Sequence, residues 1–545
     1  MLYFPSTYPI EKEVILKELF LYLIEKNIKN KKDLQFYIRE FLNKKNIKDF
    51  YPKIWHLNFI YKRYFSDIKK SSLLNFLKVV SIRSLSGIVP LSVFTSLKNS
   101  CPFNCVYCAL NNDAPKSYFS DEAAVMRAVR ANYDPFNQTF DRLVQFYLSG
   151  HPIDKVELII QGGTFSFYDK KYREWFVKRV FDGLNTDIEK IIKTGKLVLC
   201  EAKDLDEAKK INEKAKSRMV GLTIETRPDY INLDEILFLR KLGVTRVELG
   251  VQSTDDEILR LINRGHKVEK VVEATKLLRD AGFKITYHIM PGLPGSNFQK
   301  DKQVLKDIFF DEKFKPDNIK FYPTQVVKNS PLANWYKVGK FKPIDENYLL
   351  RLTQQFKKEI VPPWVRINRL VRDLTKNDLV VETFPSNFRQ NLEKYLKEKN
   401  IKCQCIRCRE IRNQKIKGKV KIDVINYQAS GGDEFFIQAI DEDYKLLGYL
   451  RLRIPFIIDK LIDCSIIREL HVLGQATPLS KSGKIQHQGL GKKLIDKAIE
   501  ITQKNNLEKI AVISAVGTRE YYRKLGFDKM TKKGEYLING LKIKN

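Results

Sequence analysis

Between about residues 80 and 375, short apolar runs rich in β-branched residues alternate with amphipathic segments, and this alternation limits the fold more than any other feature. Val156-Glu-Leu-Ile-Ile is typical of the runs, and Asp234-Glu-Ile-Leu-Phe-Leu-Arg-Lys-Leu-Gly of the helix-like segments between them. Consecutive parallel strands need a crossover helix, so repeated strand–helix units favour a parallel sheet. We therefore expect an α/β fold in which residues 81–375 form a partial (β/α) barrel.

Polar or glycine-rich residues follow most of these runs. The runs end at Gln161-Gly-Gly-Thr164, Glu225-Thr-Arg-Pro-Asp229, Gln252-Ser253 and Pro291-Gly-Leu-Pro-Gly295. A parallel barrel keeps its chemistry at the carboxyl ends of its strands. Gly162 and Gly163 would let a ligand approach the backbone, and polar side chains would fix it; these are Glu225, Arg227 and Gln252. A simple turn or a structural Arg–carboxylate pair would leave the same pattern.

A loop of three cysteines directly follows the first strand-like run. Cys101, Cys105 and Cys108 have C-x-x-x-C-x-x-C spacing, with Tyr107 before the last one. Three thiolates are too few to close a tetrahedral zinc site, but they suit three irons of a four-iron cluster whose fourth iron stays open. This pattern is typical of radical S-adenosylmethionine (SAM) enzymes. A zinc loop with a distant fourth ligand, or buried thiols, are the alternatives.

A second cysteine triplet lies in a strongly charged stretch, residues 376–420, which we interpret as a linker with a zinc motif. Cys403, Cys405 and Cys408 need a fourth ligand to close a tetrahedral zinc site. Cys464 is a better candidate than His471, because His471 lies in a strand with another predicted role. Unliganded thiols remain the alternative. Two separate triplets favour metal sites in a reducing compartment over a disulfide framework.

The pattern changes from residue 421 to successive antiparallel strand-like runs followed by a helix. Gln486-His-Gln-Gly489-Leu-Gly491 opens that helix and resembles the acetyl-CoA signature Q/R-x-x-G-x-G/A of the GNAT acyltransferases. Consecutive amides at a helix N-terminus bind pyrophosphate, and glycines let it approach. The preceding strand, Glu469-Leu-His-Val472, would pair its backbone with the pantetheine arm. Tyr521 and Tyr522 begin a later helix, where GNAT folds place a hydroxyl near the thioester sulfur; adjacent tyrosines can also be core.

The charge of the chain predicts a polyanionic partner. Its 545 residues include 97 Lys+Arg against 65 Asp+Glu, a formal net charge of +32. Residues 1–80 look like a basic helical region that binds tRNA, with Lys53, Lys62 and Arg63 on phosphates; an aromatic core under a solvated lysine face is the alternative. No apolar run approaches the ~18 residues that span a bilayer. The start, Met1-Leu-Tyr-Phe-Pro, soon becomes charged, so we expect a soluble cytoplasmic protein without a signal peptide.

With both halves placed, the chain resembles the Elongator catalytic subunit family, tRNA uridine acetyltransferases that fuse a radical SAM barrel to a GNAT-like domain. The resemblance runs from about residue 85 to the end. It rests on Cys105-Val-Tyr-Cys, Thr223-Ile-Glu-Thr-Arg-Pro-Asp-Tyr, Glu248-Leu-Gly-Val-Gln-Ser, Asn263-Arg-Gly-His, Arg468-Glu-Leu-His-Val and Ala511-Val-Ile-Ser-Ala-Val-Gly. Three positions depart from the pattern. Ala109-Leu-Asn-Asn replaces Pro-Gly-Gly, Leu473 replaces a tyrosine, and Thr164 stands where many radical SAM enzymes have an acid.

The resemblance implies the role of each residue. Cys101, Cys105 and Cys108 would ligate a [4Fe-4S] cluster, and Gly162, Gly163, Glu225, Arg227 and Gln252 would hold SAM. Lys155 would contact acetyl-CoA from the barrel side and take part in catalysis with Tyr521 and Tyr522. The remaining acetyl-CoA contacts would be Glu469, Leu470, His471, Val472, Gln486, Gly489, Leu490, Gly491, Lys492 and Tyr522. Residues 421–545 would be the acetyltransferase domain.

The implied reaction uses a SAM-derived radical to take hydrogen from the acetyl methyl group of acetyl-CoA. The carbon radical adds to C5 of wobble uridine 34 in the tRNA anticodon stem-loop, and thioester hydrolysis leaves carboxymethyluridine. A reductant for the cluster and other Elongator-type subunits are the further expected partners, with no membrane contact.

Two other functions stay open from the sequence. The first is a protein lysine acetyltransferase with a structural iron–sulfur domain, which predicts acetyl-lysine formation unaffected by Cys105→Ala. The second is a non-catalytic scaffold that binds tRNA through its basic surface; acetyl-CoA hydrolysis stimulated by tRNA would exclude it.

Overall fold

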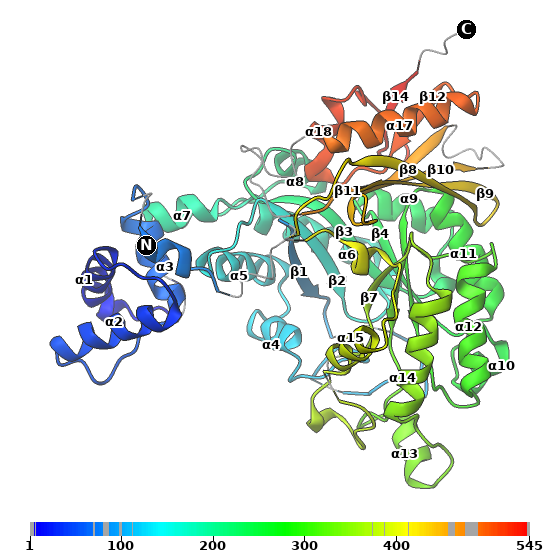
Figure 1. Ribbon diagram of the computed structural model, residues 1–545, viewed down its shortest axis with the longest axis horizontal. Coiled ribbons are helices and arrows are strands. Elements are labelled where there is room, and N and C mark those ends of the chain that lie inside the picture. Colours follow the sequence, from blue (N-terminus) through cyan, green and yellow to red (C-terminus); the bar gives the residue numbers. More distant parts are fainter. Residues whose placement is uncertain are drawn as a thin grey trace.

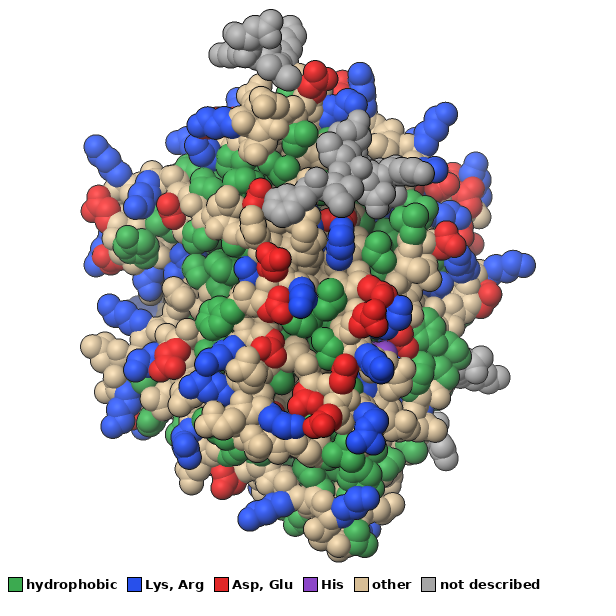
Figure 2. Space-filling model, turned by 90° about the vertical axis from the view of Figure 1, so that its right-hand side faces the viewer, with side chains coloured by type: hydrophobic (Ala, Val, Ile, Leu, Met, Phe, Trp, Pro, Cys, Tyr) green, Lys and Arg blue, Asp and Glu red, His purple; other side chains and the backbone are tan. Residues whose placement is uncertain are grey.

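The computed structural model describes residues 5, 7–68, 71–79, 87–97, 101–111, 113–372, 374–385, 387–412, 414–455, 464–474 and 489–541. Within these ranges, two seven-stranded sheets and a group of N-terminal helices make up the molecule (Figure 1). Basic and acidic side chains are interspersed over the face at the right of that view (Figure 2). None of the helices in these ranges is long and apolar enough to cross a bilayer.

The first sheet is parallel throughout and follows chain order from β1 to β7. Its strands are β1 (Val89–Phe94), β2 (Lys155–Gln161), β3 (Arg218–Thr226), β4 (Arg246–Gln252), β5 (Lys284–Ile289), β6 (Asn318–Phe321) and β7 (Arg366–Arg369). β1 and β7 are its edges, so the curled sheet is a partial barrel, and the expected fold class is confirmed (Figure 1). The sequence analysis missed β7, because Arg-Ile-Asn-Arg contains no apolar run.

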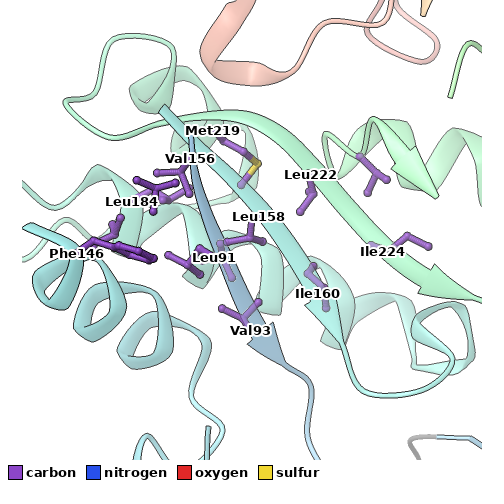
Figure 3. Close-up of a cluster of buried hydrophobic side chains, with 14 of the residues drawn as sticks. Leu91, Val93, Phe146, Val156, Leu158, Ile160, Leu184, Met219, Leu222 and Ile224 are labelled. Atoms are coloured by element: carbon purple, nitrogen blue, oxygen red, sulfur yellow. The ribbon is translucent and has the colours of Figure 1, made fainter. Parts of the chain in front are cut away.

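Side chains alternate between the two faces of this sheet, as the two-residue period of a strand requires. On β2, Val156, Leu158 and Ile160 are buried, whereas Lys155 and Glu157 face a cavity on the concave side. Figure 3 shows the apolar face, where the labelled side chains from strands and helices are Leu91, Val93, Phe146, Val156, Leu158, Ile160, Leu184, Met219, Leu222 and Ile224. The convex face is therefore core, and the concave face is left for polar groups.

In chain order, eleven α-helices of the described ranges come between β1 and β7. They are α4 (Ala123–Arg130), α5 (Pro135–Leu148), α6 (Lys170–Asn185), α7 (Ile188–Thr194), α8 (Leu205–Asn212), α9 (Leu233–Lys241), α10 (Asp256–Leu261), α11 (Val268–Asp280), α12 (Phe298–Phe310), α13 (Pro331–Lys337) and α14 (Glu346–Gln355). Short polar side chains start many of them; the Asn232 side chain, for example, accepts from the backbone N–H of Glu235 at the start of α9.

The second sheet is formed by β8 (Lys421–Gln428), β9 (Gly432–Ile440), β10 (Leu446–Pro455), β11 (Ser465–Val472), β12 (Lys509–Val512), β13 (Lys529–Met530) and β14 (Leu537–Gly540). β8 to β11 form the predicted antiparallel series, and β12 pairs in parallel with β11 only over Ser465–Ile467. The later part of β11 is thus unpaired on that side. The helices α17 (Leu490–Lys504) and α18 (Arg519–Arg523) flank β12 in the chain.

The second sheet docks at the amino ends of the first sheet's strands. Asp317, which precedes β6, receives two hydrogen bonds from Arg468 of β11, at 2.6 and 2.9 Å. Glu434 of β9 is paired with Arg468 at 2.8 Å and with Arg279 of α11 at 3.3 Å. We call the buried set Arg279, Asp317, Glu434, Arg451, Arg453 and Arg468 the interface charge network.

The N-terminal helices are α1 (Glu13–Ile24), α2 (Lys31–Lys44) and α3 (Ile54–Tyr64), and two more, α15 (Phe388–Glu398) and α16 (Ile406–Arg409), lie between the sheets in the chain. The aromatic residues of α3 are partly core, since Phe59 is fully buried. The ammonium of Lys62 lies 3.5 Å from the ring centre of Tyr147 in α5, and burial lowers its pKa to about 8. Lys62 is therefore half-buried against α5, in contrast to the exposed Lys53.

Candidate active site at the junction of two domains

One cavity of about 1580 Å³ extends along the concave face of the first sheet. At the carboxyl ends of the strands its wall includes the cysteine loop, and at their amino ends it includes β11 and the start of α17. Basic side chains outnumber acidic ones in this lining. The residues that the sequence assigned to two cofactors in two domains thus face a common space.

The cysteine loop presents three sulfur atoms next to cationic groups. Cys105 is buried, and Arg264 Nη1 lies 3.6 Å from its sulfur. A hydrogen bond from Cys108 and the nearby guanidinium lower the pKa of the Cys105 thiol to about 5, although burial opposes this. Thr164 donates to the Cys101 sulfur at 3.4 Å. An all-thiolate donor set with cationic and hydroxyl neighbours fits a [4Fe-4S] cluster.

Most of the residues predicted to hold SAM lie beside this loop. Gly162 has φ +130°, and a Cβ there would come within 2.1 Å of the Thr95 hydroxyl, so only glycine fits. Gly163 and Gln252 line the cavity. Gln252 itself has φ +71°, and its buried Oε1 has no hydrogen-bond partner. A polar cofactor needs hydrogen-bonding atoms that have no other partner and a backbone that it can approach closely. These residues offer both, so they fit SAM.

Arg227 supports the cysteine loop from within the protein. Its guanidinium lies 3.4 Å from the ring centre of Phe103, a residue of the loop, and it pairs with Asp229 at 2.9 Å. It also donates to the backbone carbonyl of Arg264 at 2.6 Å. Only its Nη1 has no hydrogen-bond partner, so one donor remains for a ligand.

The acetyl-CoA signature lies at the other end of the cavity. Gly489 begins α17 in the left-handed conformation, and a Cβ on Gly491 would lie 2.6 Å from the Tyr521 hydroxyl. Tyr522 is buried in the lining, and burial raises its pKa, which keeps the hydroxyl protonated at neutral pH. Leu490 and Lys492 also face the cavity, whereas Gln486 lies outside the described residues.

The later part of β11, which has no strand partner on the side of β12, faces the first sheet. Glu469 accepts hydrogen bonds from Tyr449 and Arg451, both at 2.9 Å, and is paired with Lys284 of β5. His471 has a buried Nε2 without a partner, and burial lowers its pKa to about 4, so it is neutral at pH 7. Lys155 of β2 lines the same end, and burial lowers its pKa.

The second cysteine triplet does not itself line this cavity, although its neighbours Arg407 and Glu410 do. The sulfur atoms of Cys403, Cys405 and Cys408 are within 4.8 Å of one another, and Lys357 donates to Cys408 at 3.5 Å. Cys464 is not part of that group; it is buried close enough to Tyr536 to influence the pKa of its hydroxyl. The described structure thus does not supply Cys464 as the fourth ligand, and zinc stays a prediction from the sequence.

Comparison with known proteins agrees with the two-domain arrangement. The chain matches the Radical SAM superfamily over residues 95–308, the Radical_SAM C-terminal domain over 316–398 and the Acetyltransferase (GNAT) domain over 481–543. It is 40% identical over 499 residues to the tRNA uridine(34) acetyltransferase of Methanocaldococcus jannaschii, covering 87% of this chain and 89% of the relative. The chain belongs to the tRNA uridine(34) acetyltransferase family.

Other members of the family are similarly related. Elongator complex protein 3 of Homo sapiens is 36% identical over 490 residues, 86% of each chain. The solved structure of Methanocaldococcus infernus Elp3 with an N-terminus deletion superposes with a TM-score of 0.71 at 38% identity, covering 84% of this chain and 100% of that one. The family is thus the one that the sequence motifs indicated.

The sequence analysis gave no role to several residues that the structure brings into the cavity. Arg264 contacts the cysteine loop, Lys284 contacts Glu469, and Lys320 contacts Glu248. A signal was present, because in β4 the apolar Val247, Leu249 and Val251 alternate with Arg246, Glu248, Gly250 and Gln252, of which all but the glycine are polar. In a parallel sheet such alternation is unusual and marks a strand face without an apolar cover.

Proposed function

We propose that this protein forms 5-carboxymethyluridine at uridine 34 of tRNA anticodons, with acetyl-CoA as the source of the two-carbon unit. The observation that carries the proposal is the shared cavity, with the cysteine loop at one end and the acetyl-CoA signature at the other. A carbon radical is easily lost in side reactions with molecules dissolved in the solvent. Generating it in a cavity beside its acceptor limits these side reactions.

Each end of the cavity has a distinct task in this proposal. Cys101, Cys105 and Cys108 hold the cluster, and Gly163 and Gln252 contact SAM. When bound, the cluster and SAM would supply a 5′-deoxyadenosyl radical and an acceptor for the one electron that product formation releases. An external one-electron reductant starts the reaction.

The acetyltransferase end holds and orients acetyl-CoA. Residues 469–472 of β11, unpaired toward β12, offer backbone groups to the pantetheine arm, and the N-terminus of α17 offers amides to the pyrophosphate. Lys155 and the protonated Tyr522 hydroxyl can donate to the thioester oxygen or sulfur. In the overall change, one acetyl methyl hydrogen and the hydrogen on uracil C5 are replaced by a carbon–carbon bond. Water then cleaves the thioester and releases CoA.

We also propose that tRNA is the polyanion that the chain's charge predicts. Among the charged side chains that line the cavity, basic ones predominate, whereas charges of both signs mix on the face in Figure 2. The exposed Lys53 of the N-terminal region is available to phosphates. Other Elongator-type subunits are further proposed partners. The anticodon base must leave its stack to reach the cavity, as bases do in other base-modifying enzymes.

Nucleoside analysis tests the proposal. We expect 5-carboxymethyluridine in tRNA incubated with cluster-reconstituted protein, SAM, reductant and acetyl-CoA, and none when any of these is left out. Failure to modify a competent cognate tRNA, together with acetylation of protein lysines, would contradict the proposal.

A further inference from the structure

Four polar side chains from four neighbouring strands of the first sheet lie together. They are Glu225 of β3, Glu248 of β4, His288 of β5 and Lys320 of β6, and we call them the inner polar cluster. Strand pairing sets Glu225 opposite Glu248 and His288 opposite Lys320. His288 Nε2 lies 2.8 Å from Glu248 Oε2, and the Lys320 ammonium contacts both carboxylates, at 3.3 Å from Glu225.

One carboxylate oxygen of this cluster is unused. Glu248 is 1% exposed, and its buried Oε1 has no hydrogen-bond partner, although the residue lines the cavity. Burial alone would raise the pKa of Glu248, but Lys320 and His288 hold it well below its ordinary value, so the group is an anion at neutral pH. A buried carboxylate oxygen without a partner is destabilising, and a donor on a ligand would remove that cost.

Two carboxylates and an imidazole could in principle hold a metal ion, but a lysine already takes that position. The Lys320 ammonium lies between Glu225 and Glu248, where a cation would sit, and it neutralises one of the two charges. What remains open is one anionic acceptor beside one ammonium donor. This pair matches a ligand edge that has an N–H next to a carbonyl oxygen.

The cluster lies between the two cofactor levels of the cavity. On β4, Gln252 at the SAM level lies beyond Glu248. Their partners on β5 are Ile289 and Thr286, three residues apart, so the two levels are separated by ~10 Å at about 3.3 Å per residue. Arg246 lies two residues before Glu248, and strand pairing sets it beside Lys284, which contacts Glu469 at the acetyl-CoA level. The acceptor of the acetyl carbon belongs between these levels.

We infer that the inner polar cluster binds the Watson–Crick edge of the target uracil: Glu248 Oε1 accepts the N3–H, and Lys320 donates to the adjacent carbonyl oxygen. This inference rests on the proposed function. The opposite edge of the ring, which carries C5, then faces the open cavity. Cytosine has a lone pair at N3 in place of the N–H, so the Glu248 carboxylate repels it and the site selects uridine.

The first test uses wild-type holoenzyme and anticodon stem-loops that differ only at position 34. Uridine, 3-methyluridine and cytidine are compared by mass spectrometry of the digested product. Loss of the N3–H is expected to lower the rate of C5 modification by about 100-fold or more for both analogues. Modification of 3-methyluridine at the uridine rate would overturn the inference while leaving the proposed function intact. Absence of product from the uridine stem-loop would instead count against the proposed function.

The second test uses Glu248→Gln, whose amide can donate to N3 of cytosine. We expect the ratio of uridine to cytidine modification to fall by about 10- to 100-fold, while SAM cleavage to 5′-deoxyadenosine continues. Glu157→Gln is the matched control, because Glu157 lines the same cavity on β2 but pairs with Arg246 below the cluster. Its uridine-to-cytidine ratio should equal that of the wild type. An unchanged ratio in Glu248→Gln would refute the assignment, and the 3-methyluridine result decides if this variant does not fold.

Discussion

The two clusters of buried charge differ in whether their carboxylates are satisfied. In the interface charge network, both oxygens of Asp317 and both oxygens of Glu434 accept hydrogen bonds from arginine side chains. In the inner polar cluster, Glu248 keeps one oxygen without a partner, facing a cavity. Buried carboxylates thus have two different roles in this protein. The carboxylates that join the domains are fully hydrogen-bonded, whereas one carboxylate oxygen in the cavity is left for a ligand.

This difference predicts that variants in the cavity lose activity at nearly constant stability, whereas variants in the interface charge network lose stability.

The largest effect is expected at the cysteine loop. Cys105→Ala removes one of the three cluster ligands, so 5′-deoxyadenosine and modified tRNA should fall below detection, more than about 10⁴-fold. Iron content and 5′-deoxyadenosine are the measurements. Cys200→Ala, a half-buried cysteine away from the cavity lining, should keep both. Wild-type SAM cleavage by Cys105→Ala would show that the loop is not the cluster site.

The next effect concerns stability. Asp317→Ala removes the carboxylate that accepts two hydrogen bonds from Arg468 and leaves this buried guanidinium with only Glu434 as a carboxylate partner, so the free energy of unfolding should fall by about 3–5 kcal/mol. Urea denaturation measures it. Asp443→Ala is the control, since its pair with Lys417 is exposed, screened by solvent and should contribute little to stability. Equal losses in the two variants would erase the distinction between buried and exposed pairs.

A smaller change is expected at the acetyl-CoA end. Tyr522→Phe removes only a hydroxyl, so tRNA-stimulated acetyl-CoA hydrolysis should fall about 10- to 100-fold, with the unfolding free energy changed by less than about 1 kcal/mol. The exposed Tyr444 supplies the matched control, Tyr444→Phe, which should behave as wild type. Hydrolysis at the wild-type rate in Tyr522→Phe would remove this hydroxyl from the reaction.

The smallest effect is a dependence on pH. Burial would raise the pKa of Asp317, but Arg468 and Arg451 hold it far below its ordinary value. Its contribution to stability is therefore fully present above the ordinary carboxyl pKa of about 4 and declines as pH falls below that value toward the much lower folded pKa. The difference in unfolding free energy between wild type and Asp317→Asn should thus shrink between pH 5 and pH 3. A difference that does not depend on pH would contradict the cited cause.

Local patterns predicted the elements and the two signatures, but not the contacts that long-range pairing creates. The cysteine loop and the glycines before α17 carry their chemistry in a few consecutive residues. Glu248, His288 and Lys320 come from three strands, and only the parallel register brings them together. For the same reason, sequence spacing could not predict that Arg227 packs on Phe103. It also could not predict that Cys464 is not part of the second triplet's group of sulfur atoms.

The central claim is that one cavity serves both cofactors, and a label in the acetyl group tests it most directly. With acetyl-CoA carrying three deuterium atoms on its methyl group, 5′-deoxyadenosine should gain one deuterium and the carboxymethyl group on uridine should keep two. Unlabelled 5′-deoxyadenosine, or a product that keeps all three deuterium atoms, would show that the radical and the acetyl group do not meet.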